Sequence, residues 1–261
     1  MRIPMRLLCV PLLSATAAQA GVVVHMASKH LPDEHPKDHS IIYAQDGYLR
    51  IDSLDDQGHV RDIQLIRDGV IWMVDVPKRT FHKLDKSAMA AQQTGLQDKM
   101  QAMMQNMPPE RRAMFEARMK AMQTQTHDYT LSDAGRSERV ASYSCEIWQA
   151  SRDGKISTEY CVAAKGSIAG GDELVAASHK AAAVATDVMS ASPQMSRAIS
   201  PIYALYGKMD GFPVLVRHIS GGKMEHEETV TAIESQSLAA DKFAIPKGFT
   251  EATPDNLGAD D

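Results

Sequence analysis

The hydrophobic positions of residues 21–85 follow the alternating period of β-strands. Short apolar or alternating segments are separated by Asp46-Gly47 and Asp68-Gly69, and both pairs tolerate the positive φ angles of tight turns. Successive strands should therefore fold back on one another as antiparallel hairpins. The predicted strands lie at residues 22–24, 41–43, 48–51, 63–66, 70–74 and 81–84.

The pattern changes to a helical period after residue 87. Apolar side chains recur at steps of four, three and four on one face of a predicted helix over residues 88–105. This face carries Leu96, Met100, Met103 and Met107. Proline is well tolerated in a first helical turn, so Pro108-Pro109 predicts a second helix over residues 107–122.

A second helical block is predicted at residues 172–189 and, beyond Ser192-Pro193, at residues 194–208. The first of these helices has an apolar stripe formed by Leu174, Ala177, Ala181, Val184 and Val188. Both helical blocks therefore lie between groups of strands.

Strands return at residues 139–150 and 156–163, on either side of a turn. Cys145 and Cys161 are each eight residues from Asp153 in that turn. We therefore expect them to face one another within one residue of register and to form a structural disulfide. A redox-active pair is less favoured, because the sequence has no Cys-x-x-Cys motif.

The end of the chain predicts a last hairpin from residues 212–219 and 224–233, with an edge strand at residues 243–246. No linker-like stretch divides the chain. Residues 21–248 are expected to form one α+β domain, an antiparallel sheet with two helical insertions. Residues 249–261 should form an acidic, disordered tail.

The first 20 residues have the features of a signal peptide. Arg2 and Arg6 precede a short apolar run, and Ala18-Gln19-Ala20 is a small-residue cleavage site. The apolar run is shorter than the ~18 residues that a membrane span needs. We expect a soluble periplasmic protein without stable membrane insertion. Cys9 precedes the cleavage site inside the apolar run, so lipid attachment there is the less favoured alternative.

Composition and motifs exclude several functions. The net charge of -5 and the pI near 6.1 provide no strongly basic surface, so a nucleic-acid partner is not expected. Metalloprotease, serine-hydrolase, nucleotide-binding and dinucleotide-binding motifs are missing from the sequence. Ser220-Gly221-Gly222-Lys223 has the letters of a Ser-x-x-Lys motif, but its glycines favour a hairpin turn. We therefore predict a non-enzymatic protein without a cofactor.

Several short motifs resemble an uncharacterised family of exported bacterial proteins, known only as a domain of unknown function. They are Gly47 to Asp52, the Met-rich middle with Met107 to Arg111, the Cys145 to Cys161 hairpin and Phe243 to Phe249. The resemblance implies a fold similar to the half-barrel of periplasmic lipoprotein carriers, in which a curved antiparallel sheet holds apolar ligands beneath helices. It transfers no catalytic residue.

The Met-rich helices are the most unusual feature of the chain. Methionine adapts to different apolar partners, so these helices could line a groove or form a lid over the sheet. The candidate groove residues are Leu96, Met100, Met103, Met107, Met114, Phe115, Met119 and Met122. With the implied fold, they predict a periplasmic binding protein for an apolar ligand such as a lipid or lipopeptide, with a lipid or lipoprotein as partner.

Two alternatives remain open. Thioethers are soft ligands that select Cu(I), so Met100, Met103, Met104 and Met107 could serve a copper-handling protein together with histidines. The helices could also form an envelope protein-interaction module.

The histidines give only weak metal signals. His25, His30, His35 and His39 lie near the mature N-terminus, with prolines between them that favour a surface loop. His218 and His226 are expected to be cross-strand neighbours in the last hairpin, most simply as a polar surface pair.

Overall fold

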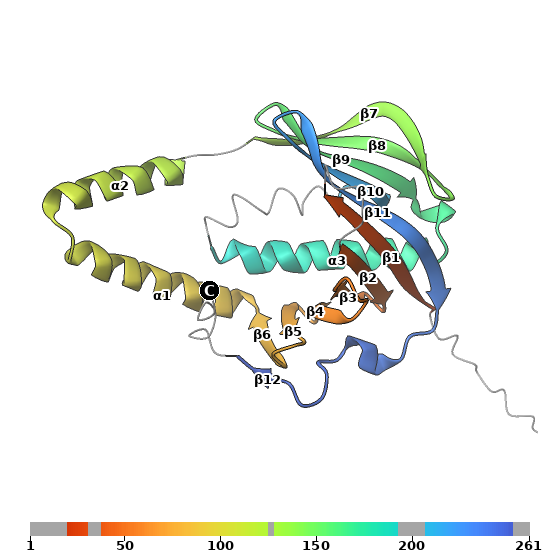
Figure 1. The fold of residues 1–261 in the computed structure, drawn as a ribbon, viewed down its shortest axis with the longest axis horizontal. Helices are drawn as coiled ribbons and strands as arrows, with labels where there is room; N and C mark the ends of the chain where they lie inside the picture. Colours follow the sequence, from red (N-terminus) through yellow and green to blue (C-terminus); the bar gives the residue numbers. More distant parts are fainter. Residues whose placement is uncertain (1–19, 31–37, 125–127, 193–206, 253–261) are drawn as a thin grey trace, which may run out of the picture.

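The computed structural model describes residues 20–30, 38–124, 128–192 and 207–252 (Figure 1). Twelve strands occur in these ranges: β1 Gly21–His30, β2 Asp38–Gln45, β3 Tyr48–Leu54, β4 Val60–Arg67, β5 Val70–Asp75, β6 Thr80–Leu84, β7 Tyr129–Val140, β8 Tyr143–Arg152, β9 Lys155–Ala164, β10 Gly211–Ser220, β11 Lys223–Gln236 and β12 Thr250–Glu251. The helices of the same ranges are α1 Lys86–Gln105, α2 Pro109–Thr124 and α3 Gly171–Ser190, with short 3₁₀ turns η1 Lys165–Ser167 and η2 Ala240–Phe243. None of these helices is long and apolar enough to cross a membrane.

All twelve strands form one open sheet in the order β12-β6-β5-β4-β3-β2-β1-β11-β10-β9-β8-β7. Each pairing is antiparallel except that of β12 with β6, which is parallel. Two meanders, β1 to β6 and β7 to β11, are joined where β1 pairs with both β2 and β11. The observed architecture is therefore α+β, as predicted, with an open and curved antiparallel sheet.

The hairpin turns follow the local sequence. Asp46 and Gly47 have φ angles of 55° and 71°, and Asp68 and Gly69 have 52° and 76°. Both residues of a type I′ turn need positive φ, which Asp and Gly accept at low cost. The strong turn signals of the sequence thus produce the first meander as expected.

Helix α3 lies inside the curve of the sheet, with strands above and below it in Figure 1. Its predicted stripe forms part of the core, since Leu174, Ala177, Ala181 and Val188 are buried. Gly171 permits the close start of the helix, because a Cβ there would collide with the carbonyl oxygen of Lys165. The second helix of this predicted block falls mainly on residues 193–206, outside the described residues.

Helices α1 and α2 extend away from the sheet as an arm (Figure 1). The carboxylate of Asp85 caps α1 by accepting a hydrogen bond from the backbone N–H of Ala88 at 2.8 Å. Met89 near this end is buried, where α1 packs against α3 and β6. The Arg112 guanidinium of α2 donates to the carbonyl oxygen of Met104 at 2.9 Å, which joins the two helices. The predicted pair of helices is therefore present, with contact to the body mainly at the start of α1.

The predicted disulfide is confirmed, although its register differs from expectation. Cys145 and Cys161 are bonded, with their Cα atoms 5.2 Å apart. Cys161 pairs with Ile147, not with Cys145, so the disulfide joins diagonal neighbours. The β8–β9 turn is centred between Asp153 and Gly154, and the ladder shifts by a bulge between Ala150 and Ser151. Each feature shifts the pairing by one residue.

Three strand predictions need correction. Strand β7 begins at Tyr129, and the chain reverses between Val140 and Tyr143, inside the segment predicted as one strand. The predicted edge strand at residues 243–246 is absent, because η2 ends at Phe243 and the chain then packs against the sheet without pairing. The actual edge strand is β12, which lies within the segment predicted as a disordered tail.

Candidate functional site

A cavity of about 450 Å³ lies between α3 and the strands it faces. Its volume falls within the range of ~300–1,000 Å³ that is usual for small-molecule sites. Aliphatic and other apolar side chains from both meanders dominate the lining. The cavity is lined by Met26, Ile42, Leu49, Ile51, Gln64, Ile66, Ser178, His179, Ala181, Ala182, Gly211, Phe212, Pro213, Val216 and Glu228.

The space exists because small residues of α3 face the strands. Ala181 and Ala182 occupy the helix surface at the cavity, and Gly211 begins β10 on the opposite side. Gly211 is required by its neighbours, since a Cβ there would collide with the carbonyl oxygen of Ala163. Small side chains on a helix that faces a curved sheet leave volume that larger side chains would fill.

Most polar groups of the cavity already have partners within the protein. The Ser178 hydroxyl donates to the carbonyl oxygen of Leu174 at 2.8 Å, and Nε2 of His179 lies 3.0 Å from the carbonyl oxygen of Met209. Glu228 contacts a histidine on its own strand, described below. The remaining surface is largely apolar, so the cavity favours an apolar ligand with few polar groups.

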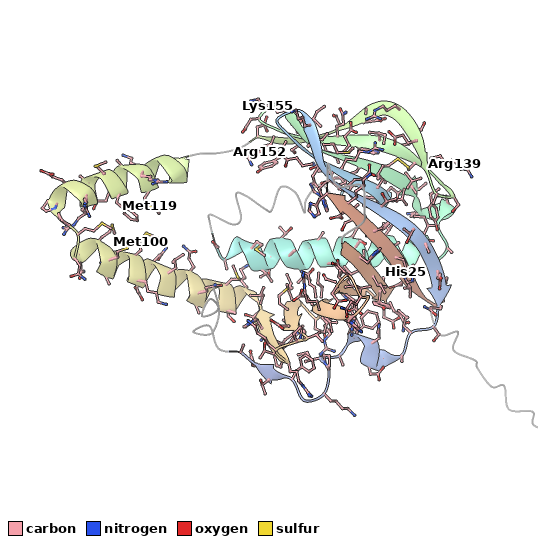
Figure 2. The ribbon with its side chains drawn as sticks, in the orientation of Figure 1. His25, Met100, Met119, Arg139, Arg152 and Lys155 are labelled. Carbon is pink, nitrogen blue, oxygen red and sulfur yellow. A yellow bond between two sulfur atoms is a disulfide. The ribbon has the colours of Figure 1, made fainter. Side chains whose placement is uncertain are left out.

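The structure places the eight predicted groove residues on the arm of α1 and α2, and none of the seven whose side chains are described lines this cavity. Leu96, Met103 and Met114 are 52%, 47% and 75% exposed. Figure 2 shows Met100 and Met119 on the sides of α1 and α2 that face each other. The remaining candidates Met107 and Phe115 are half-buried, as is the copper candidate Met104, and the side chain of Met122 lies outside the described residues. The groove and copper hypotheses for these residues stay predictions.

Three histidines form a row across adjacent strands. His226 of β11 pairs with His218 of β10, as predicted, and also with His30 of β1. The ring centroids are 4.3 Å apart for His30 and His226, and 5.5 Å apart for His218 and His226. The sequence prediction missed His30, because β1 was expected to end before it. Pairing of β1 with β11 has no local signal in the sequence.

The row lies beside the cavity. Glu228 is two residues from His226 on β11, so both side chains are on one face of the sheet. A carboxylate oxygen of Glu228 lies 3.1 Å from Nε2 of His226. Partial desolvation lowers the pKa of His218 below its ordinary value. Among the described residues, no three His, Cys, Asp or Glu side chains already converge closely enough to hold a metal ion.

The other early histidines are separated from the row. His25 is on β1 at a position that points to the opposite face from His30, as its odd spacing predicts. His39 is on β2, and His35 lies outside the described residues. The predicted surface loop is therefore replaced by strand at His25, His30 and His39.

The Gly47 to Asp52 motif contains a buried ion pair. Nε of Arg50 donates to Oδ1 of Asp52 at 2.5 Å, and a second Arg50 nitrogen lies 3.1 Å from Oδ2. Arg50 also donates to the carbonyl oxygen of Lys242 at 2.8 Å, while the Lys242 ammonium lies 3.8 Å from the centroid of the Tyr43 ring. This cluster fixes η2 and the chain that follows it to the sheet, which is a structural role.

The fold and cavity define the protein as an α+β protein whose open, curved antiparallel sheet wraps around one helix. A family model, Domain of unknown function (DUF4412), matches residues 79–249. The chain therefore belongs to this family, which confirms the resemblance found in the sequence. No curated protein matches the chain.

Solved structures show a distant likeness. An uncharacterized conserved protein from Thermus thermophilus is 9% identical, with 90% of each chain covered and a TM-score of 0.43. PNGF-II is 8% identical, with 90% of this chain and 31% of that chain covered and a TM-score of 0.42. MucB is 10% identical, with 87% and 57% covered and a TM-score of 0.35. These TM-scores are low, so the functions of those proteins do not extend to this chain.

Proposed function

We propose that this protein is a non-enzymatic exported binding protein that holds an apolar or amphipathic ligand, such as a lipid or lipopeptide. The ligand occupies the cavity between α3 and the sheet. The observation that carries the proposal is the cavity itself, with a volume of about 450 Å³ and a mostly aliphatic lining. Transfer of an apolar ligand from water to such a site is favourable by ~25 cal/mol per Å² of apolar surface removed from water.

Three features support the proposed export. Residues 1–20 have the pattern of a signal peptide, although they lie almost entirely outside the described residues. Strand β1 begins at Gly21, directly after the predicted cleavage site. The disulfide between Cys145 and Cys161 is of the kind that persists in oxidising compartments.

The first test is native mass spectrometry of protein purified from its own periplasm. A bound lipid or lipopeptide should appear as a reproducible mass above that of the processed chain. The same protein should bind a fluorescent palmitic acid analogue, and natural lipids should displace that probe. Repeated spectra of the bare chain, together with no probe binding, would overturn the proposal.

A pair of neighbouring variants locates the site. Ala182 lines the cavity, whereas Ala183 on the same helix is exposed. Ala182→Leu should fill part of the cavity and weaken probe binding by at least about tenfold, equivalent to ~1.4 kcal/mol. Ala183→Leu adds the same side chain outside the cavity and should leave the affinity unchanged. Circular dichroism checks that both variants are folded.

The arm of α1 and α2 is the competing location for the ligand. Met114 is its most exposed large apolar residue among those described. Met114→Gln should leave probe binding unchanged if the ligand occupies the cavity. If Met114→Gln abolishes binding while Ala182→Leu has no effect, the ligand site is the arm and the cavity proposal is wrong.

A further inference from the structure

His30, His218 and His226 form a row of three histidines, whereas the sequence predicted only a polar surface pair of His218 and His226. Register places the three residues directly opposite one another on β1, β11 and β10, with His226 in the middle. Directly opposed residues in antiparallel strands have Cβ atoms ~4.5–5.5 Å apart and point to the same side of the sheet. Three imidazoles therefore share one small region of the surface.

The central ring has one nitrogen occupied and one available. Nε2 of His226 lies 3.1 Å from a carboxylate oxygen of Glu228. An ionised carboxylate only accepts hydrogen bonds, so Nε2 carries the hydrogen and Nδ1 of the neutral ring has a lone pair. This Nδ1 is buried and has no hydrogen-bond partner among the residues that the structure describes. A buried nitrogen lone pair without a donor is costly unless something binds it.

A hydrogen bond between a histidine and a carboxylate is common at metal sites. Histidines that bind metals commonly donate their other ring N–H to a carboxylate, which fixes the ring and increases its basicity. Glu228 supplies that carboxylate to His226, and the rings of His30 and His218 flank the His226 ring in the row. The negative charge of Glu228 also favours a cation over an anionic ligand at this position.

We propose that His30, His218 and His226 form a binding site for a divalent transition-metal ion, with Zn²⁺ as the reference ion. Glu228 holds the His226 ring in place through its hydrogen bond and does not itself contact the metal ion. The three rings do not converge on one point as they stand. His30 and His218 are exposed, so their rings can turn toward Nδ1 of His226 on binding. The site does not depend on whether the cavity holds a lipid.

The experiment is calorimetric titration of the full exported chain with ZnCl₂, using protein purified without a polyhistidine tag. We expect one Zn²⁺ per chain. His218→Ala and His30→Ala change exposed side chains and should fold normally, and each should weaken binding at least about tenfold. His25→Ala is the matched control, because His25 is on β1 but on the opposite face, and it is labelled in Figure 2. Its affinity for Zn²⁺ should equal that of the parent.

Two further measurements distinguish this site from other metal sites. Glu228→Gln keeps the shape of the side chain but removes its charge, and should weaken binding by roughly 10–100-fold. X-ray absorption of the Zn²⁺-loaded protein should show imidazole nitrogens at ~2.0–2.1 Å. Sulfur ligands at ~2.3 Å, no detectable Zn²⁺ binding, or equal binding by the His218→Ala and His25→Ala proteins would each overturn the proposal.

Discussion

The ion pair of Arg50 and Asp52 is buried, and from this burial we predict how much stability the protein loses when Asp52 is removed. Asp52 is 1% exposed and accepts hydrogen bonds from two nitrogens of Arg50. The Lys242 ammonium is also 3.7 Å from Oδ2 of Asp52. Asp52→Ala would leave two cations close together, one of them buried, with no opposing charge.

The expected cost of Asp52→Ala is large. Removal of one member of a buried ion pair typically costs ~3–5 kcal/mol, because the remaining charge stays buried and uncompensated. For a domain of this size, ~1 kcal/mol corresponds to a change of roughly 2–4 °C in the melting temperature. The melting temperature of Asp52→Ala should therefore fall by roughly 10 °C.

Urea unfolding followed by circular dichroism measures this loss, and the protein provides its own control. Asp62 pairs with Arg61 at 2.7 Å, but the Asp62 side chain is 43% exposed. Asp62→Ala should cost less than ~1 kcal/mol, as exposed ion pairs usually do. Equal losses for the two variants would refute the reasoning, because the pairs differ mainly in burial.

A second variant covers the case in which Asp52→Ala fails to fold. Replacement of both partners by apolar residues, Arg50→Met with Asp52→Leu, removes the two charges together. Such exchanges are often neutral or stabilising, so the double variant should be more stable than Asp52→Ala alone. A double variant that is less stable than the single variant would contradict the proposed cause.

Two other properties follow from the structure. Replacement of Cys145 and Cys161 by alanine should lower the free energy of unfolding by roughly 3 kcal/mol, because the disulfide closes a loop with a sequence separation of 16. Urea unfolding without reductant measures this loss, and an unchanged unfolding midpoint would contradict the prediction. The bidentate hydrogen bonds from Arg217, together with its charge, lower the pKa of Glu138. The ionised Glu138 therefore stabilises the folded protein above the ordinary glutamate pKa, and this stabilisation is lost as the pH falls through the lowered pKa of the folded state. The parent should thus be more stable than Glu138→Gln at pH 7, the difference should shrink below pH ~4, and a constant difference across that range would be inconsistent with the pairing.

Local signals account for the parts of the fold that the sequence predicted well. Asp46-Gly47 and Asp68-Gly69 specify turns by their own φ preferences, and the strands on each side follow from alternation. The stripe of α3 could be recognised because a helix surrounded by strands must bury one face. These features depend on residues close together in the chain.

Strand β7 was missed for a physical reason. It is an edge strand, with a mixed pattern of exposed and half-buried residues and Gly135 at a positive φ near its centre. An edge strand needs no continuous apolar face, so alternation is weak. The part of the disulfide register that comes from the bulge between Ala150 and Ser151 was also out of reach, because one bulged residue shifts a ladder without a signal in composition.

The arm of α1 and α2 shows the limit of periodicity. An apolar stripe identifies which face of a helix avoids water, but not what covers it. Only Met89, near the start of α1, is buried in the arm residues whose side chains are described, and the methionines beyond it lie on the extended part. The cavity could not be predicted, because the residues that line it are far apart in the sequence. Its walls come from strands of both meanders, together with the small residues Ala181 and Ala182 of α3.

Strand β1 places the cavity and the histidine row next to each other. Met26 and His30 are four residues apart on β1, so they lie on one face of the sheet, Met26 in the cavity lining and His30 in the row. Glu228 of β11 belongs to both, as a lining residue and as the partner of His226. Because of this shared residue, Glu228→Gln should alter both Zn²⁺ affinity and probe binding.

The two proposals can nevertheless be separated by residues that belong to one feature alone. Ala182 is on α3, outside the row, and His218 lies outside the cavity lining. Ala182→Leu should weaken the palmitic acid probe and leave Zn²⁺ binding intact, while His218→Ala should have the opposite effect. If either variant weakens both ligands equally in folded protein, the cavity and the row act as one site, and the metal ion would then be expected to contact the bound ligand directly.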